Sequence, residues 1–133
     1  GLHNKLGGVY LSTKRFELAI DAFERALAID AESPLAFEGI GRAKLELGDA
    51  DAALESALTA AELVHHFPKA HLTIGRALNA LGDYVGAVEA LELCVKQSPK
   101  MVDAHRALAT AYRGLGESAK AMQADLRVKQ VLG

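Results

Sequence analysis

The chain has 133 residues, half of them hydrophobic, which is enough for one folded domain and too few for two ordinary ones. Aromatic residues make up only 5% and Trp is absent, so a core must be built from closely packed aliphatic side chains, which favours tightly packed helices. The formal net charge of -2 provides no long-range attraction for nucleic acid or for an anionic membrane surface. We therefore expect neither of these as a partner.

Three absences narrow the class of protein further. No run of about 18 uninterrupted apolar residues is present, so no transmembrane helix is expected. The chain begins with Gly1 and carries no signal-peptide pattern, and we interpret it as part of a longer, soluble protein, with the cytoplasm as the favoured compartment. The single cysteine, Cys94, can form no intrachain disulfide and belongs to no zinc-ligand pair, so we expect it to act as a small apolar residue.

A pattern of small and apolar residues recurs along the chain with a period of 34 residues, and its clearest copy runs from Pro68 to Met101. Sliding the sequence by one period brings these residues into register without an insertion. The aligned columns are Gly7, Gly41, Gly75 and Ala109; Ala19, Ala53, Ala87 and Ala121; Ala26, Ala60, Cys94 and Val128; and Gly48, Gly82 and Gly116.

Each unit predicts two helices, because its apolar residues recur at three- and four-residue spacing. The expected helices cover residues 2–13, 16–29, 35–47, 50–63, 69–81, 84–97, 102–115 and 118–131. Corner glycines suit the left-handed conformation that ends a helix, and the acidic residue after each can cap the next helix. These pairs are Gly48-Asp49, Gly82-Asp83 and Gly116-Glu117, whereas the first corner, residues 13–15, has no glycine. Pro34 and Pro68 suit the first turn of a helix.

The third unit carries His71-x2-Ile74-Gly75-x2-Leu78, then Ala87-x3-Leu91-x2-Cys94, and ends at Pro99. This framework resembles the tetratricopeptide repeat, whose W-x2-L-G-x2-Y, A-x3-F and P positions have the same spacing. The resemblance covers essentially the whole chain and implies an all-α fold, an α-α superhelix of about eight antiparallel helices. It implies a single domain with repeats at residues 1–33, 34–67, 68–101 and 102–133. The departures from the family's aromatic positions are His3, Phe37, His71, His105, Lys44 and Asp125.

Small residues at two columns predict how the helices of a pair approach one another. Gly75 and Ala87, with their equivalents, allow an interaxial distance of about 8 to 10 Å. A bulky residue in either column is expected to overpack the pair, as in Ala87→Leu.

Histidine is the first candidate for chemistry, because His3, His71 and His105 share one repeated column. Metal ligands must lie about 2 Å from one ion, whereas equivalent positions of stacked repeats are about 10 Å apart. We therefore expect rings packed at helix seams, and we interpret His65 and His66 as part of a connector. Motifs for phosphate binding, nucleophilic serine and zinc hydrolysis are absent, so we expect no metal, cofactor or catalytic residue.

The resemblance implies that the first helix of each pair lines a concave groove. The polar residues expected on this face are Asn4, Glu38, Arg42, Lys69, Thr73, Arg76, Asn79, Arg106, Thr110 and Arg113. Cations outnumber carboxylates there, and most are Arg, whose planar fork binds carboxylates in a bidentate way. The functional interpretation is a non-catalytic protein-interaction module whose groove binds an acidic peptide or protein. The alternative is a set of ordinary solvated charges paired with Glu38, Glu46 and Asp103.

One known activity of the family is disfavoured by the residues present. The carboxylate clamp that holds chaperone tails needs Lys and Asn in the first unit, Asn in the second, and Lys and Arg in the third. The aligned residues here are Asn4, Gly8, Gly39, Lys69 and Thr73, of which only Lys69 matches.

The last helix is expected to expose Val128, Val131 and Leu132, which suggests self-association through the C-terminal helix or a continuing chain. This leads to an alternative function, an accessory docking or oligomerisation region of a larger enzyme. The segments HHFPKAH and LGDYVGAVEALE loosely resemble the repeat tails of some bacterial hydrolases of the alkaline phosphatase superfamily.

Overall fold

The computed structural model describes all 133 residues and contains eight α-helices and no strand. The helices are α1 (Leu2–Ser12), α2 (Phe16–Ile29), α3 (Pro34–Glu46), α4 (Ala50–Leu63), α5 (Pro68–Ala80), α6 (Tyr84–Gln97), α7 (Val102–Gly114) and α8 (Ser118–Leu132). Every boundary lies within one residue of the one expected from the 34-residue pattern. The all-α helical-repeat prediction is therefore confirmed.

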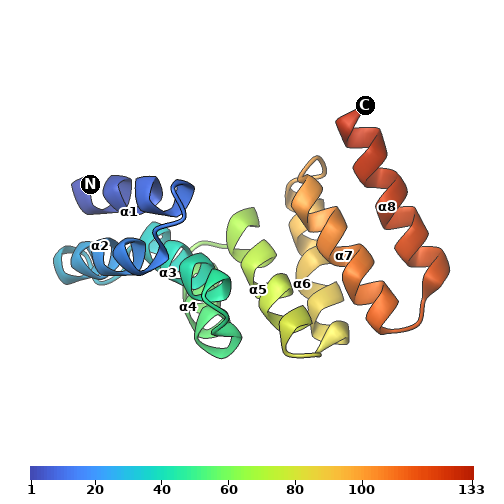
Figure 1. The fold of residues 1–133 in the computed structure, drawn as a ribbon, viewed down its shortest axis with the longest axis horizontal. Coiled ribbons are helices and arrows are strands. Elements are labelled where there is room, and N and C mark those ends of the chain that lie inside the picture. Colours follow the sequence, from blue (N-terminus) through green and yellow to red (C-terminus); the bar gives the residue numbers. More distant parts are fainter. The chain divides into compact units, whose positions relative to one another are not determined.

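The chain forms two compact units, each made of two helix pairs (Figure 1). The first unit covers Gly1–His65 and contains α1 to α4, and the second covers His66–Gly133 and contains α5 to α8. In each unit, successive helices pack on one another, and the first helix of one pair also contacts the first helix of the next. None of the eight helices combines the length and the hydropathy that a membrane span requires.

The core of the first unit is organised around Phe23 of α2, whose ring lies between two helices that present glycine to it. A Cβ atom on Gly7 of α1 would lie 2.6 Å from the ring carbons, and a Cβ atom on Gly39 of α3 would also overlap the ring. Ile40 completes this cluster together with several fully buried alanines. The aromatic residue therefore needs glycine on both sides.

The second unit repeats this arrangement with an aliphatic residue in place of the ring. Leu91 of α6 is fully buried, and a Cβ atom on Gly75 of α5 would overlap its side chain. Ala87, Ala107 and Leu108 belong to the same core cluster. The prediction that small residues permit close helix pairs is confirmed at Gly75. Ala87 is fully buried, and its part in the approach of the two helices stays a prediction.

Corners between the helices of a pair use positive backbone φ angles. Gly48, Gly82 and Gly116 have φ values of 88°, 80° and 74°. Lys14 adopts φ 61° at the first corner, which explains how that corner turns without a glycine. A lysine side chain is strained in this region of backbone space.

Two of the three expected acidic caps are present. Asp49 accepts a hydrogen bond from the backbone N–H of Ala52, and Asp83 accepts one from Gly86. The prediction for Glu117 is wrong, because its side chain makes no capping bond to α8. Its carboxylate instead lies 3.5 Å from the ammonium of Lys120. The side chain of Glu is one methylene longer than that of Asp, and Glu is not among the residues preferred at helix N-caps.

Cys94 is fully buried in the second unit, in agreement with the apolar role expected for it. Its Sγ donates a hydrogen bond to the carbonyl of Pro68 at 3.3 Å and lies 3.5 Å from the sulfur of Met101. Burial raises the pKa of the Cys94 thiol to about 11, so the residue stays protonated at neutral pH.

Candidate functional site

The first-helix residues of the first unit are held by contacts within the chain. Asn4 of α1 donates a hydrogen bond to the Ser33 hydroxyl, which in turn caps α3 by accepting from Ala36. Glu38 is 3% exposed, and its carboxylate lies 3.5 Å from the guanidinium of Arg42, which is partly exposed. Asn4 and Glu38 therefore contribute to the packing of the first unit.

Two polar residues on α5 of the second unit also contribute to packing. Thr73 is only 2% exposed, and Asn79 donates a hydrogen bond to the backbone carbonyl of Ala107 in α7 at 3.0 Å. This bond ties the two first helices of the unit together. Lys69 is exposed at the start of α5, and Arg76 is partly exposed one turn before Asn79.

Three of the expected residues lie on α7 and are exposed. Arg106 lies 3.8 Å from Asp103 one turn earlier, in a pair whose side chains are both more than half exposed. Thr110 donates to the carbonyl of Arg106 within the helix. Arg113 forms a salt bridge with Asp125 of α8. The guanidinium of Arg113 is therefore engaged toward the second helix of its own pair.

The expected site residues thus divide by exposure rather than by charge. Lys69, Arg106 and Thr110 of the second unit are open to solvent, while Glu38 and Thr73 are buried. The exposed members can contact a partner without rearrangement. Which of them do so stays a prediction.

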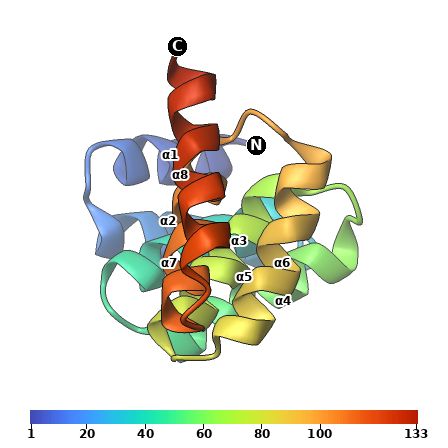
Figure 2. The ribbon, with the colours of Figure 1, turned by 90° about the vertical axis from the view of Figure 1, so that its right-hand side faces the viewer.

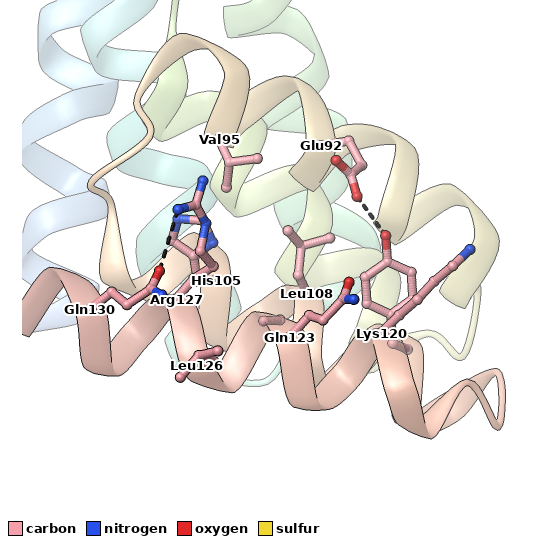
Figure 3. A pocket seen from close by; sticks show the side chains of 11 residues that line it. Glu92, Val95, His105, Leu108, Lys120, Gln123, Leu126, Arg127 and Gln130 are labelled. Carbon is pink, nitrogen blue, oxygen red and sulfur yellow. Dashed lines mark hydrogen bonds between the residues drawn. The ribbon is translucent and has the colours of Figure 1, made fainter.

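Sequence reasoning did not anticipate a hollow between α6 and α8, whose floor is α7 (Figure 3). It has a volume of about 540 Å³. The lining residues are Glu92, Val95, His105, Leu108, Tyr112, Lys120, Gln123, Ala124, Leu126, Arg127 and Gln130. On α8, Lys120, Gln123, Arg127 and Gln130 recur every three or four residues, so a polar stripe was visible in the sequence. The opposing wall is formed by Glu92 and Val95 of α6. The pattern of polar residues in α8 could not predict that α6 lies opposite.

The polar groups of the hollow are largely satisfied by one another. The Tyr112 hydroxyl donates to the carboxylate of Glu92 at 2.5 Å, and the Lys120 ammonium lies 5.7 Å from the centre of the Tyr112 ring. Burial, together with the Glu92 carboxylate and the nearby Glu117, raises the pKa of Tyr112 to about 12. The guanidinium of Arg127 donates to the amide oxygen of Gln130 at 3.4 Å (Figure 3). The hollow therefore offers polar contacts to a partner or ligand.

The repeated histidines occupy structural positions. His105 is buried, and its Nε2–H donates to the carbonyl of Pro99 at 2.7 Å, which connects the start of α7 to the preceding turn. His3 and His71 are partly buried at the equivalent places in their helices, whereas His65 and His66 are exposed. No group of three His, Cys, Asp or Glu side chains is placed to hold a metal ion.

Models of the tetratricopeptide repeat family match the chain along almost all its length, at residues 1–33, 39–101 and 72–130. No curated protein sequence matches it.

Several solved structures have the same fold. TTC0263, described as a thermophilic TPR protein of Thermus thermophilus, has a TM-score of 0.87 and 24% identity, covering 97% of this chain and 72% of that one. MamA has a TM-score of 0.84 and 22% identity, covering 97% and 75%. The first TPR of Spaghetti (RPAP3), bound to the HSP90 peptide SRMEEVD, has a TM-score of 0.81 and 21% identity, covering 86% and 91%.

Proposed function

The chain belongs to the tetratricopeptide repeat family, and from this premise we propose that it is a non-catalytic module that binds a protein or peptide. The binding surface is the exposed face of the first helices, above all α5 and α7 of the second unit. The bound segment carries carboxylates, either acidic side chains or a free C-terminus.

The observation that carries this proposal is the exposure of cations on α5 and α7. Lys69 and Arg106 are open to solvent, and Thr110 adds an exposed hydroxyl one turn beyond Arg106. The carboxylate of Asp103 lies 3.8 Å from the guanidinium of Arg106, and exposed pairs of this kind contribute about 0 to 1 kcal/mol. A ligand carboxylate can therefore replace Asp103 at little cost. Asn79 supports the surface by fixing α5 against α7.

One structural neighbour supports carboxylates as the recognised group. The peptide bound to the RPAP3 repeat domain, SRMEEVD, contains two Glu and one Asp. In the present chain only Lys69 matches the clamp that the family uses for chaperone tails. We therefore propose the same chemical class of ligand, with a different arrangement of contacts and without specificity for that tail.

Selection from a random peptide library displayed on phage tests the proposal. We expect the wild-type chain to enrich peptides with Asp, Glu or a free C-terminal carboxylate, and the variant Lys69→Glu/Arg106→Glu to lose that enrichment. The matched control is Lys14→Glu/Arg25→Glu, which makes the same two charge changes at exposed sites of the first unit outside the first-helix face. Equal enrichment by both variants, or enrichment without carboxylates, would contradict the proposal.

A second candidate function is docking or oligomerisation within a larger protein. The observation that favours it is the set of large apolar side chains exposed on the outer faces of α1 and α8, including Leu2, Val9, Met122 and Leu126. Leu132 is exposed as expected, whereas Val128 and Val131 are partly buried. Exposed apolar groups on helices at an end of a unit suit helix-to-helix packing with another chain.

A further inference from the structure

The outer face of α1 carries apolar residues in columns that are buried elsewhere in the repeats. Leu2, Leu6 and Val9 are all exposed. Their equivalents one period later, Ala36, Ile40 and Ala43, are buried in the core of the first unit, in the cluster that includes Phe23 of α2. In α7 the same columns hold Ala104, Leu108 and Ala111, which are also buried. These columns therefore form the face with which a first helix packs on a preceding second helix.

The outer face of α8 presents the other half of such a junction. In α2, the helix that receives α3, the residues toward the core are Ile20, Phe23 and Leu27. In α6, which receives α7, they are Val88, Leu91 and Val95. The same columns in α8 hold Met122, Asp125 and Lys129. Met122 and Lys129 are exposed and Asp125 is partly exposed. Figure 2 shows α8 in front of the other helices of the second unit. Exposed Leu126 lies beside them.

The α2–α3 junction fixes the register of a first helix on a second helix, and the α6–α7 junction agrees with it. Gly39 of α3 faces Phe23 of α2, since a Cβ atom on Gly39 would overlap the ring. Ala107 of α7 shares a core cluster with Leu91 of α6. Lys5 of α1 is the equivalent of Gly39 and Ala107, and Asp125 of α8 is the equivalent of Phe23 and Leu91. In the same register, the column of Lys5 falls opposite the column of Asp125.

This pairing is complementary in both charge and size. The internal junctions combine a large residue on the second helix with a small one on the first. At the outer faces the sizes are reversed, because the first helix α1 carries the long residue Lys5 and the second helix α8 carries the short residue Asp125. Leu2 and Val9 are likewise larger than Ala36 and Ala43, so they supply apolar volume that α8 lacks at Asp125 and Lys129.

Other charges at this junction include Arg113 and Lys129 on the α7–α8 side. On the side of α1 they include the amino terminus of Gly1 and the carboxylate of Asp30. Arg113 occupies the column of Asn79, which donates to the carbonyl of Ala107, the equivalent of Lys5. The guanidinium has enough donors to keep Asp125 and to reach the Lys5 carbonyl. Lys129 falls toward the Gly1 end of α1, where the amino terminus has the same sign and the carboxylate of Asp30 has the opposite sign.

We propose that α1 of one copy of this chain packs on α8 of a second copy, in the register of α3 on α2 and of α7 on α6, with Lys5 opposite Asp125. This proposal specifies the partner in the second candidate function and is independent of peptide binding by α5 and α7. The contact is heterologous, so each copy keeps one free face and association continues beyond a dimer unless the assembly closes into a ring. A contact of one helix on another is small, and we expect its dissociation constant between micromolar and millimolar.

Sedimentation velocity of the intact chain from about 10 µM to about 1 mM tests the proposal. The mean mass of the wild-type chain is expected to rise with concentration. Val9→Glu, on the outer face of α1, is expected to keep the chain monomeric. The matched control is Val85→Glu on α6, because Val9 is 55% exposed and Val85 is 60% exposed, and both lie on helices. The control is expected to associate like the wild type.

Charge reversal identifies the partner face. Lys5→Glu and Asp125→Lys are each expected to weaken association by about fivefold, and the double variant is expected to recover it. Lys129→Leu, which restores the apolar residue of its column, is expected to strengthen association. Circular dichroism verifies that each variant remains helical.

Three results would overturn the proposal. The first is a wild-type chain that stays monomeric at every concentration. The second is equal loss of association in Val9→Glu and Val85→Glu. The third is association that responds to Val9→Glu but not to either Asp125→Lys or the double variant, which would indicate α1 packing on α1. Peptide selection by Lys69 and Arg106 is measured separately, so failure of one proposal leaves the other standing.

Discussion

Gly7 and Gly8 are neighbours in α1 but meet different surroundings. A Cβ atom on Gly7 would contact the Phe23 ring at 2.6 Å, whereas nothing lies within 4 Å of the same atom on Gly8. Phe23 cannot move away from Gly7, because Gly39 lies against the ring on its other side. The need for glycine is therefore set by the size of the facing side chain and not by the helix itself.

We expect Gly7→Ala to lower the free energy of unfolding by about 1 to 3 kcal/mol, since the added methyl overpacks the core. Gly8→Ala is the matched control and should raise it by about 0.5 to 1 kcal/mol, because alanine is the better residue in an exposed helix. Urea unfolding of both variants provides the measurement. Equal effects of the two substitutions would contradict the packing described for Phe23.

Tyr112 makes the stability of the second unit depend on pH in the alkaline range. Its pKa is raised from 10.0 to about 12 in the folded chain, first by burial and then by Glu92. The folded state therefore holds this proton more tightly than the unfolded state. The stabilisation is fully present below about pH 10 and is lost as the pH rises toward 12.

Unfolding experiments at about pH 9 and about pH 11 should show a loss of stability in the wild type that is smaller in Tyr112→Phe. Glu92→Gln should bring the tyrosinate absorbance of Tyr112 to a lower pH, because the negative charge that opposes ionisation is gone. The difference spectrum against Tyr112→Phe isolates this residue from Tyr10 and Tyr84. An unchanged titration in Glu92→Gln would show that Glu92 has no part in the shift.

At the scale of helices, the boundaries could be predicted because their causes are local. Pro34 begins α3. Gly82 adopts φ 80° in the corner between α5 and α6, and the side chain of Asp83 caps α6. Glu117 was mispredicted as a cap because a carboxylate after a corner glycine is only a candidate, and the side chain turned to Lys120 instead. Competition between local partners decides such cases, and the sequence does not display it.

Asp83→Ala is expected to destabilise the second unit by about 1 kcal/mol, through loss of the bond to the Gly86 N–H. Glu117→Ala is the matched control at the equivalent place before α8 and should have a smaller effect, because no capping bond is lost. Thermal unfolding followed by circular dichroism compares the two. A larger effect of Glu117→Ala would reverse the assignment of caps.

The site was less predictable than the helices, because exposure depends on contacts between distant segments. Thr73 and Lys69 both appear on the polar side of the helix pattern, yet the structure buries Thr73 and leaves Lys69 open. Arg113 likewise fits an open face but is engaged with Asp125, twelve residues later. The hollow over α7 needs residues from three helices, which periodicity alone does not bring together.

At the scale of the whole molecule, exposed cations and exposed apolar side chains lie on different helices. The chain is net negative, yet its exposed first helices in the second unit present Lys69 and Arg106. The outer faces of α1 and α8 instead present apolar side chains. Binding of an acidic peptide should therefore weaken with salt. Self-association should depend mainly on apolar contact and shape.

The central claim is that a carboxylate-bearing peptide binds on the first helices α5 and α7. It is tested most directly by backbone amide NMR spectra of the labelled chain during titration with a selected acidic peptide that carries a spin label. We predict that the amide signals of Lys69, Arg106 and Thr110 broaden first and that those of Gln123, Arg127 and Gln130, along the hollow between α6 and α8, are little affected. Broadening centred on the hollow, with α5 and α7 unchanged, would contradict the account.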